Sequence, residues 1–317
     1  MAAMKLVTFE RGGRRAIGAV TGRGIVSLGA LVPELAVPML ELIRRADALM
    51  PLAESALADP IPDRALSPPE IVRLLAPLPD PPSMRDGYAF RQHVETARRN
   101  RGLAMIEEFD LFPVFYFTNH QAVIGPGELR VGGRRLEHLD FELEIAVVLG
   151  RETRNPSLAE ADRAIFGYTI MNDFSARALQ MEEMKLNLGP AKGKDFATAI
   201  GPWLVTADEL APRLTPSEKG NVLHAAMAAD VNGVRVSVGN ADQMHWTFAE
   251  ILARAGDGVT LHPGDVIGSG TVGTGCFLEL NGSKITHDQW LKPGDAIALS
   301  VDGLGTLSHT IAEDARC

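Results

Sequence analysis

The segment FELEIAVVLG, residues 141–150, constrains the fold more than any other part of the chain. Its run of aliphatic residues predicts a strand, and successive side chains of a strand point to opposite faces of a sheet. Glu142 and Glu144 therefore share one face and lie about 6.6 Å apart along the strand. Two like charges this close repel unless solvent or a cation compensates them. The pair indicates either a solvated outer face or a metal site.

The composition is that of a globular protein that lacks a basic surface. The chain has 317 residues, 46% hydrophobic and 22% charged, which is enough for one large core or two domains. A formal net charge of -9 makes nucleic acid or an anionic membrane an unexpected partner. No signal-peptide core and no apolar run of about 18 residues occurs, and Cys276 and Cys317 form no disulfide framework. We therefore expect a cytoplasmic protein.

A proline-rich segment divides the chain into two parts. Residues 4–30 alternate short apolar runs with glycine-rich breaks, which predicts two or three small strands in hairpins, and a helical stretch follows over 37–58. The next segment, LADPIPDRALSPPEIVRLLAPLPDPPSM, opposes both helices and central strands. We predict a small N-terminal domain with a proline-rich linker over 1–79, and a larger domain over 80–317.

The larger part is expected to be mainly β with some α. AFRQHVETARRN has helical periodicity, and two further helices are expected near 158–164 and 246–254. The predicted strands are PVFYF, FELEIAVVL, FGYTIMND, PWLVT, AAMAADVNG and VRVSV. LHPGDVIGSG and LKPGDAIALS each place a Pro-Gly-Asp turn before a strand, and repeated tight corners favour a rolled or barrel-like sheet.

Two further carboxylates and one histidine complete a candidate site. Asp173 ends the apolar strand of YTIMND, and Asp86 is expected to begin the helix that carries His93, on the same face. Each aspartate alone is equally explained as a cap or turn residue, and the histidine as a core residue. Together with the two glutamates they form an all-oxygen set that suits Mg²⁺, or alternatively Mn²⁺ or Ca²⁺, rather than Zn²⁺. Beside such an ion His93 is a natural general base.

Two other motifs carry weaker interpretations. GSGTVG, residues 268–273, matches GxGxxG, but the following CFLELNG reads as a strand, whereas a dinucleotide site requires a helix there. A tight turn is the expected structure. Cys276 is expected to be a buried structural thiol rather than a nucleophile, because nothing nearby indicates a lowered pKa.

Four segments, in order, resemble the fumarylacetoacetate hydrolase family. They are RDGYAFRQH (85–93), FELEIA, GYTIMNDFSAR and LGPAKGKDFATAIGPWLV (188–205). Each is weak alone, but the ordered set is specific, and the resemblance covers roughly residues 80–310. It implies the family fold, a rolled mixed β-sheet or barrel that forms the catalytic domain and follows a small β-rich N-terminal domain. It also implies a homodimer.

The resemblance assigns the site residues and the chemistry. The implied metal ligands are Asp86, Glu142, Glu144 and Asp173, the implied catalytic residues are His93 and Lys194, the implied substrate contacts are Tyr88, Arg177, Gln180 and Lys194, and Thr198 is implied behind the metal. The expected activity is divalent-metal-dependent hydrolysis of a carbon-carbon bond in a 2,4-dioxo acid, with His93 activating water. Decarboxylation, hydration and isomerisation of 2-oxo acids are alternatives with the same site.

One departure from the family pattern concerns the partner of the catalytic histidine. In the animal enzyme a glutamate from a late glycine-rich segment pairs with that histidine. The corresponding segment here, GSGTVGTGC, carries Cys276 instead. Glu107 or Glu108 of AMIEEFD is therefore a candidate for the pairing acid.

Overall fold

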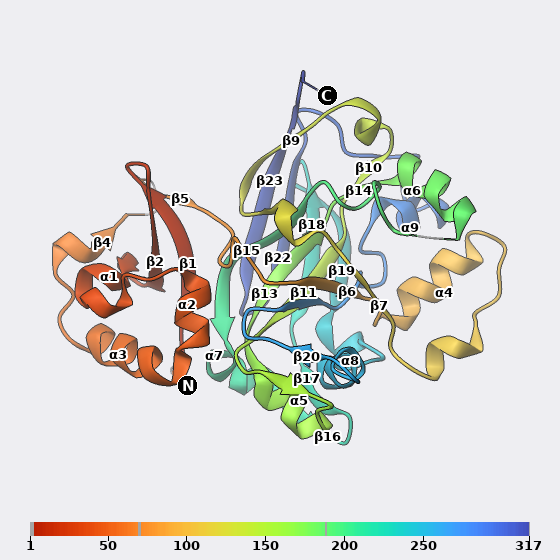
Figure 1. Cartoon of the computed structure of the whole chain (residues 1–317). Helices are drawn as coiled ribbons and strands as arrows, with labels where there is room; N and C mark the ends of the chain where they lie inside the picture. The colour runs from red at the N-terminus through yellow and green to blue at the C-terminus, as the bar shows by residue number, and fades with distance from the viewer. Residues whose placement is uncertain (1–2, 69–70, 188, 317) are drawn as a thin grey trace.

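The computed structural model describes residues 3–68, 71–187 and 189–316, so that Leu188, which begins one of the four motifs, and Cys317 lie outside the described residues. The fold is mixed and mostly composed of strands, as predicted, with an N-terminal β-rich part that precedes the larger part (Figure 1). In the described ranges no helix is both long and apolar enough to cross a membrane.

A long mixed sheet runs through both parts of the chain. Among the described residues it has 12 strands, in the order β4-β3-β2-β1-β15-β13-β11-β21-β6-β7, with β5 beside β1 and β8 beside β15. Its strands are β1 Lys5–Arg11, β2 Arg14–Thr21, β3 Gly24–Ser27, β4 Leu66–Ser67, β5 Arg73–Leu74, β6 Met84–Gly87, β7 Phe115–Phe117, β8 Val123–Ile124, β11 Leu143–Leu149, β13 Ile165–Asp173, β15 Thr198–Thr206 and β21 Val266–Gly268. The predicted hairpins near the N-terminus are present, and β1 pairs with β15 of the larger part.

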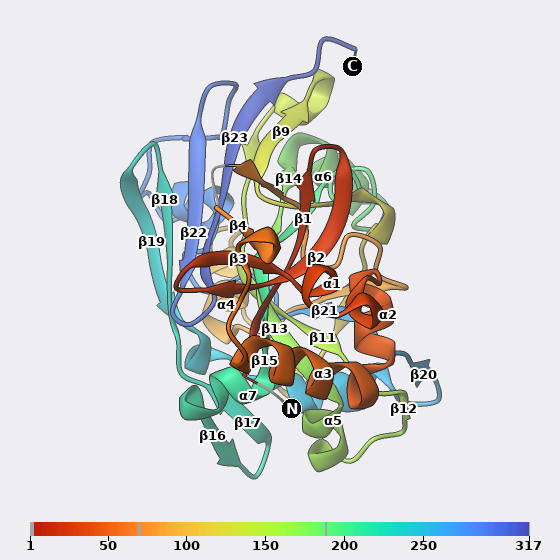
Figure 2. The ribbon, with the colours of Figure 1, turned by 90° about the vertical axis from the view of Figure 1, so that its left-hand side faces the viewer.

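A second sheet faces the first. It has the order β19-β18-β22-β23-β9 and consists of β9 Gly127–Val131, β18 Ala226–Val231, β19 Val234–Asn240, β22 Ala296–Val301 and β23 Gly305–Glu313. The remaining strands form three small pairs: β10 Leu139–Asp140 with β14 Ser175–Ala176, β12 Thr153–Arg154 with β20 Thr260–Leu261, and β16 Leu214–Ser217 with β17 Gly220–Leu223. The turned view in Figure 2 shows the second sheet beside the N-terminal strands.

Helices cover the ends and the outer face of the long sheet. Their bounds are α1 Leu28–Leu31, α2 Met39–Arg44, α3 Ala46–Ala58, α4 Arg91–Arg99, α5 Leu158–Ala164, α6 Arg177–Glu183, α7 Ala207–Leu210, α8 Phe248–Ala255 and α9 Phe277–Gly282. The helices expected at 37–58, 158–164 and 246–254 are confirmed within a few residues. Capping boxes at Ser157 and Thr247 begin two of them.

Strand β11 is buried on both faces, which explains its continuous apolar run. Leu143, Ile145 and Val147 belong to the core between the two sheets. Ala146 and Val148 belong to the core that α1, α2 and α3 cover. Apart from Glu144, the strand therefore has no polar side chain, as expected for a central strand.

The two Pro-Gly-Asp turns have the same construction. The side chain of Asp265 accepts a hydrogen bond from the backbone N–H of His262, and that of Asp295 accepts one from Lys292, each at 2.9 Å. Each turn leads into a strand, β21 or β22, as the sequence predicts. An aspartate that bonds backbone within its own turn fixes the corner locally.

The structure corrects the expectation that Asp86 begins the helix of His93. Asp86 lies in β6, and α4 begins only at Arg91. Strand β6 forms because it pairs with β21 on one side and β7 on the other, which places Asp86 opposite Tyr116. The sequence RDGY has no strand periodicity of its own, so these partners decide its conformation.

The expectation of a strand at CFLELNG is also wrong, because these residues form α9. A short apolar run does not distinguish a strand from a buried helix. A helix does therefore follow the GSGTVG loop, and the glycines need another explanation. Gly270 has φ +76°, and a Cβ there would lie 2.5 Å from the backbone oxygen of Gly87. The loop is packed against β6 rather than open to a phosphate group.

Candidate active site

Three carboxylates meet where β6 ends and β11 begins. Asp86 lies on β6, Glu144 on β11, and Glu142 directly before β11. One oxygen from each lies within 4.8 Å of the others, and all three side chains are buried. The fourth predicted ligand, Asp173, ends the neighbouring strand β13. The alternation of β11 thus turns both glutamates toward this edge, as the sequence predicts.

Two buried cations hold Glu142 ionised. The Lys194 ammonium lies 2.5 Å from its Oε2, and the Arg177 guanidinium 2.8 Å from its Oε1. Burial opposes ionisation, but Lys194 and Arg177 together lower the pKa of Glu142 to about 2. Glu142 therefore remains a carboxylate at any physiological pH.

Asp173 shares Lys194 with Glu142. Its Oδ2 lies 2.8 Å from the Lys194 ammonium and also accepts a hydrogen bond from the Tyr116 hydroxyl, and Thr198 donates to Oδ1 at 3.3 Å. Burial and the charge of Glu142 raise the pKa of Asp173, and the nearby Lys194 ammonium only partly offsets this increase. Although burial disfavours its charge, Asp173 and Glu142 raise the pKa of Lys194, which keeps it an ammonium.

Asp86 and Glu144 lack such compensation. Asp86 accepts hydrogen bonds from the Tyr116 hydroxyl and from the Gly270 N–H, both at 3.1 Å. Glu144 Oε1 accepts one from Thr271 at 3.2 Å, whereas no described residue donates to its buried Oε2. Burial, and then the charge of Asp173, raise the pKa of Asp86 to about 7, and burial and the charge of Asp86 raise the pKa of Glu144 well above its usual range.

This donor set suits a hard divalent cation. Buried carboxylates are normally paired with cations or coordinate a metal, and here one buried carboxylate oxygen has no donor. An ion bound between Asp86, Glu142 and Glu144 would reverse the repulsion that raises two of the three pKa values. Ligands that are all oxygen favour Mg²⁺, Mn²⁺ or Ca²⁺.

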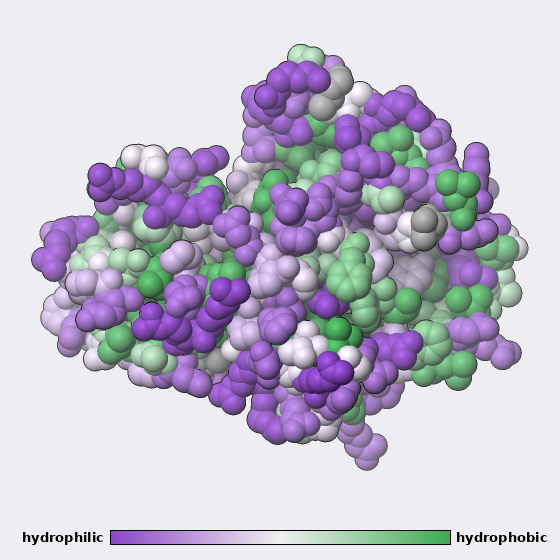
Figure 3. Space-filling model, in the orientation of Figure 1, coloured by the Kyte–Doolittle hydropathy of each residue, from purple (hydrophilic) through white to green (hydrophobic). Residues whose placement is uncertain are grey.

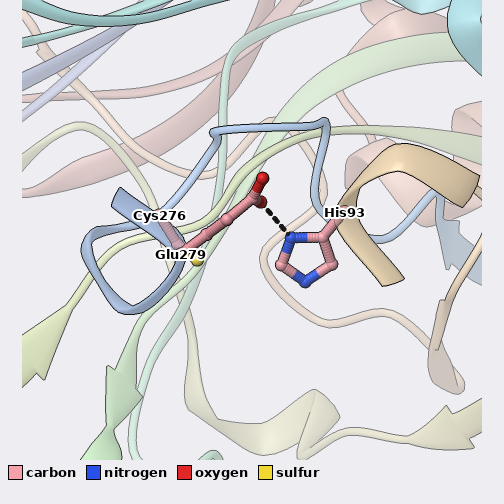
Figure 4. Close-up of side chains that lie close together, drawn as sticks. All are labelled: His93, Cys276 and Glu279. Carbon is pink, nitrogen blue, oxygen red and sulfur yellow. Dashed lines mark hydrogen bonds and ion pairs between the residues drawn. The ribbon is translucent and has the colours of Figure 1, made fainter. Parts of the chain in front are cut away.

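The predicted base, His93, pairs with Glu279 of α9. His93 Nδ1 lies 2.6 Å from Glu279 Oε2, and both side chains are buried (Figure 4). The other ring nitrogen, Nε2, points away from Glu279 (Figure 4). Glu107 and Glu108, the expected partners, lie instead in an exposed 3₁₀ turn. The pairing acid was missed because CFLELNG was read as a strand.

Asp140 connects this pair to the carboxylates. Its fully buried side chain accepts hydrogen bonds from the backbone N–H groups of Phe277 (2.7 Å) and Leu278 (2.9 Å), which begin α9. It also accepts one from Arg177 Nε at 2.8 Å, and the same guanidinium reaches Glu142. Asp140 thus fixes the helix that carries Glu279 and the cation that holds Glu142.

Cys276 lies beside the His93–Glu279 pair, and the three side chains together have the donor atoms of a second candidate metal site. One donor atom from each of the three residues lies within 4.8 Å of the others. Burial, and then the charge of Asp140, raise the pKa of the thiol well above its usual value. A thiol that stays protonated is a poor metal ligand and a poor nucleophile. Cys276 is buried, as the sequence predicts.

A cavity of about 540 Å³ opens onto both groups. Glu279 lines it together with eight of the predicted site residues: Asp86, Tyr88, His93, Glu142, Glu144, Arg177, Gln180 and Lys194. Asp173 and Thr198 are not among its lining residues. The ring of Tyr88 stands edge-on to His93, with 5.9 Å between ring centroids. The sequence reasoning did not find Tyr116, although its alternation in PVFYF could have placed it on one face of β7.

Comparison with known proteins identifies the family. The family described as "Fumarylacetoacetate (FAA) hydrolase C-terminal" matches residues 83–312. A 2,4-didehydro-3-deoxy-L-rhamnonate hydrolase from Sphingomonas sp. (strain SKA58) is 28% identical, over 98% of this chain and 96% of the relative. The human mitochondrial oxaloacetate tautomerase FAHD2A is 26% identical, over 97% of this chain and 91% of the relative.

A solved structure shares the whole fold. It is a fumarylacetoacetate hydrolase from psychrophilic Exiguobacterium antarcticum, with a TM-score of 0.73 and 26% identity, covering 98% of this chain and 100% of that chain. These relatives include both a tautomerase and hydrolases, so the family contains more than one reaction on the same fold.

Proposed function

The chain belongs to the fumarylacetoacetate hydrolase family, and from that premise we propose that it is a divalent-metal-dependent hydrolase that cleaves a carbon-carbon bond in a 2,4-dioxo acid. One observation carries the proposal: three buried carboxylates, within 4.8 Å of one another, share a cavity with a histidine that is paired with its own carboxylate. The first group fits a cation and the second fits a general base.

Asp86, Glu142 and Glu144 would hold the cation, which we propose to be Mg²⁺, with Asp173 as the fourth acidic residue beside them. Such a cation supplies electrostatic stabilisation where negative charge develops on the substrate oxygens. Lys194 has two of its N–H groups directed at Glu142 and Asp173. Its third can donate to a substrate oxygen, because an ammonium carries three donors. Arg177 and Gln180 also line the cavity, where they can orient the substrate carboxylate.

His93 is the proposed general base. Glu279 occupies Nδ1, so Nε2 is left to accept a proton from water. Glu279 also stabilises the imidazolium that then forms, because a buried carboxylate fixes the tautomer and compensates the charge.

The proposed reaction consumes one water. The oxygen of the water that His93 deprotonates attacks the carbonyl carbon distal to the carboxylate, and the bond from that carbon to the adjacent methylene breaks. The electron pair goes to the methylene carbon and forms the enolate of a 2-oxo acid. Proton return from His93 to that carbon gives a carboxylic acid and a 2-oxo acid, so that atoms and charge balance.

The proposal is tested with acylpyruvates, which absorb in the ultraviolet and lose this absorbance on cleavage. We expect turnover that chelation abolishes and added Mg²⁺ restores. His93→Ala should lose at least about 100-fold in kcat, the usual range for general base removal, while Mg²⁺ still raises its melting temperature. Full turnover after chelation, or by His93→Ala, would refute the proposal.

Tautomerisation or isomerisation of a 2-oxo acid is the second candidate. The human relative is an oxaloacetate tautomerase, and such a reaction needs proton transfer by His93 but no attack by water. Decarboxylation is a further alternative on the same site. Product analysis separates them: hydrolysis gives two acids, decarboxylation gives CO₂, and tautomerisation exchanges solvent deuterium into recovered substrate without any net product.

We also propose a homodimer. The segment from the end of α4 through β7 exposes large hydrophobic side chains, among them Leu103, Leu111, Phe112 and Phe117. Hydrophobic surface is visible on that side of the molecule in Figure 3. Contiguous exposed apolar residues mark interaction sites. Light scattering should give twice the chain mass, and Leu111→Asp with Phe117→Asp should give the monomer. A wild-type monomer at micromolar concentration contradicts this assignment.

A further inference from the structure

The cavity extends well beyond the groups that the proposed chemistry uses. Its volume of about 540 Å³ lies in the range that accommodates drug-sized ligands, roughly 300–1,000 Å³. Besides the carboxylates, Lys194 and His93, the cavity is lined by apolar side chains from α6 and the turn after it, from α9 and from the loop after α9, namely Met181, Met184, Leu278 and Trp290, with Pro190. A 2,4-dioxo acid with a short acyl group would leave much of this apolar lining uncovered.

The two asparagine side chains that line the cavity are already engaged within the protein. Asn281 Nδ2 donates to the backbone oxygen of Gln289, and Asn281 Oδ1 accepts from Thr286 and from the Gln289 N–H. Asn100 Nδ2 donates to the backbone oxygen of Glu279 and to Ser283. These bonds hold α9 to α4 and to the following loop. The asparagines therefore present few polar groups to a ligand.

Trp290 is fixed as an apolar surface. Its ring stacks on that of His138, with 4.6 Å between centroids and 22° between planes. Its indole N–H donates to Asp288 at 2.8 Å. Because the polar atom is engaged, the ring offers the cavity only its apolar part. The methionine side chains that share the lining with this ring can adapt to ligands of varied shape.

One charged residue could favour a different ligand. Arg101, at the end of α4, lines the same cavity, and its Nε donates to the backbone oxygen of Ala97. Its side chain is exposed, so water solvates the guanidinium. A substrate with a second carboxylate could form an ion pair with Arg101. That carboxylate would make no favourable contact with the five apolar side chains.

We infer that this apolar part of the cavity lining selects a 2,4-dioxo acid whose acyl group is bulky and apolar, an aromatic or branched alkyl group, and that Trp290 determines this specificity. The inference rests on the proposed function for the position of the dioxo acid. An apolar group there removes its own surface and that of Trp290 and the methionines from water, which favours binding.

The test uses 2-oxo acids that lack the second carbonyl and therefore cannot be cleaved. Calorimetry with Mg²⁺ present compares pyruvate, 2-oxo-4-phenylbutanoate and 2-oxoadipate. We expect the phenyl compound to bind at least about tenfold more tightly than pyruvate, and 2-oxoadipate to show no such gain. Trp290→Ala should remove the gain and leave pyruvate binding unchanged, whereas Trp290→Phe should keep most of it.

Three results overturn the inference. Equal binding of pyruvate and the phenyl compound would show that the apolar wall is not used. Tighter binding of 2-oxoadipate, lost in Arg101→Ala, would assign an anionic acyl group instead. If acylpyruvates are not cleaved but the phenyl compound still binds more tightly than pyruvate, only the proposed hydrolysis is rejected. Absence of all 2-oxo acid binding would reject the inference and the proposed function together.

Discussion

Glu144→Gln should stabilise the metal-free protein and abolish its response to Mg²⁺. Glu144 is fully buried, accepts one hydrogen bond, and has one oxygen without a donor. Leaving a buried polar group unsatisfied costs roughly 1–3 kcal/mol, and more when it is charged. Glutamine has nearly the same shape but no charge. We therefore expect a gain of about 1–3 kcal/mol in the free energy of unfolding at pH 8 with chelator present, which raises the melting temperature by a few degrees.

The gain should depend on pH in a defined direction. The fold raises the pKa of Glu144 well above its usual value, so between the ordinary and the raised pKa the folded state binds more protons than the unfolded state. Stability of the wild type therefore falls as pH increases through that interval. Glutamine does not titrate. The difference between variant and wild type should be small near pH 4.5 and grow toward pH 8.

Glu142→Gln is the matched control, because it removes a carboxylate from the same cluster. Lys194 and Arg177 both contact Glu142, and breaking a buried ion pair costs about 3–5 kcal/mol. This variant should lose stability at pH 8. Thermal unfolding of the three proteins, with chelator and with Mg²⁺, provides the assay. If Glu144→Gln is destabilised like Glu142→Gln, or if Mg²⁺ stabilises it as much as the wild type, the assignment of Glu144 as a ligand is wrong.

Three further predictions follow from the same contacts. Asp140→Asn should lower kcat at least about tenfold while changing KM less, because it loosens α9 and Arg177 without touching substrate. Asp295→Asn, in the turn before β22 where the side chain bonds Asn232 and the Lys292 N–H, should keep full activity; equal losses in steady-state kinetics would deny Asp140 a positioning role. Mg²⁺ affinity should increase with pH through the pKa of about 7 of Asp86, because the ion displaces the proton from the carboxyl group. Calorimetry in buffers of different ionisation enthalpy should detect this proton release; binding without proton release would contradict the raised pKa of Asp86. Cys276 should resist iodoacetamide in the native protein and react after unfolding, as peptide mass spectrometry would show; rapid native alkylation would contradict its burial.

The parts of the site that follow from strand geometry were predictable from the sequence. Because side chains alternate between the two faces of a strand, Glu142 and Glu144 share one face wherever FELEIAVVLG forms a strand. Their mutual repulsion, once buried, then requires a cation nearby. Lys194 and Arg177 turned out to be those cations for Glu142. That leaves Glu144 as the carboxylate for which the repulsion argument still requires another positive charge.

The parts decided by distant partners were not predictable. Strand β6 owes its conformation to β21 and β7, which are far from it in sequence. Helix α9 begins where Asp140, 137 residues earlier, accepts the N–H of Phe277. Local sequence patterns do not reveal either long-range interaction. For that reason the prediction placed Asp86 in a helix and CFLELNG in a strand, and both assignments are wrong. Glu279 was missed for the same reason.

The pairing of β1 with β15 gives the first residues of the chain a protective role. Lys5 and Leu6 stand opposite Val205 and Leu204, and the Met4 N–H donates to Thr206. Without them, this side of β15 would expose unpaired backbone groups, and such an edge can recruit strands from other molecules. A version of this protein shortened at its N-terminus would therefore be prone to aggregate unless another segment covered that edge.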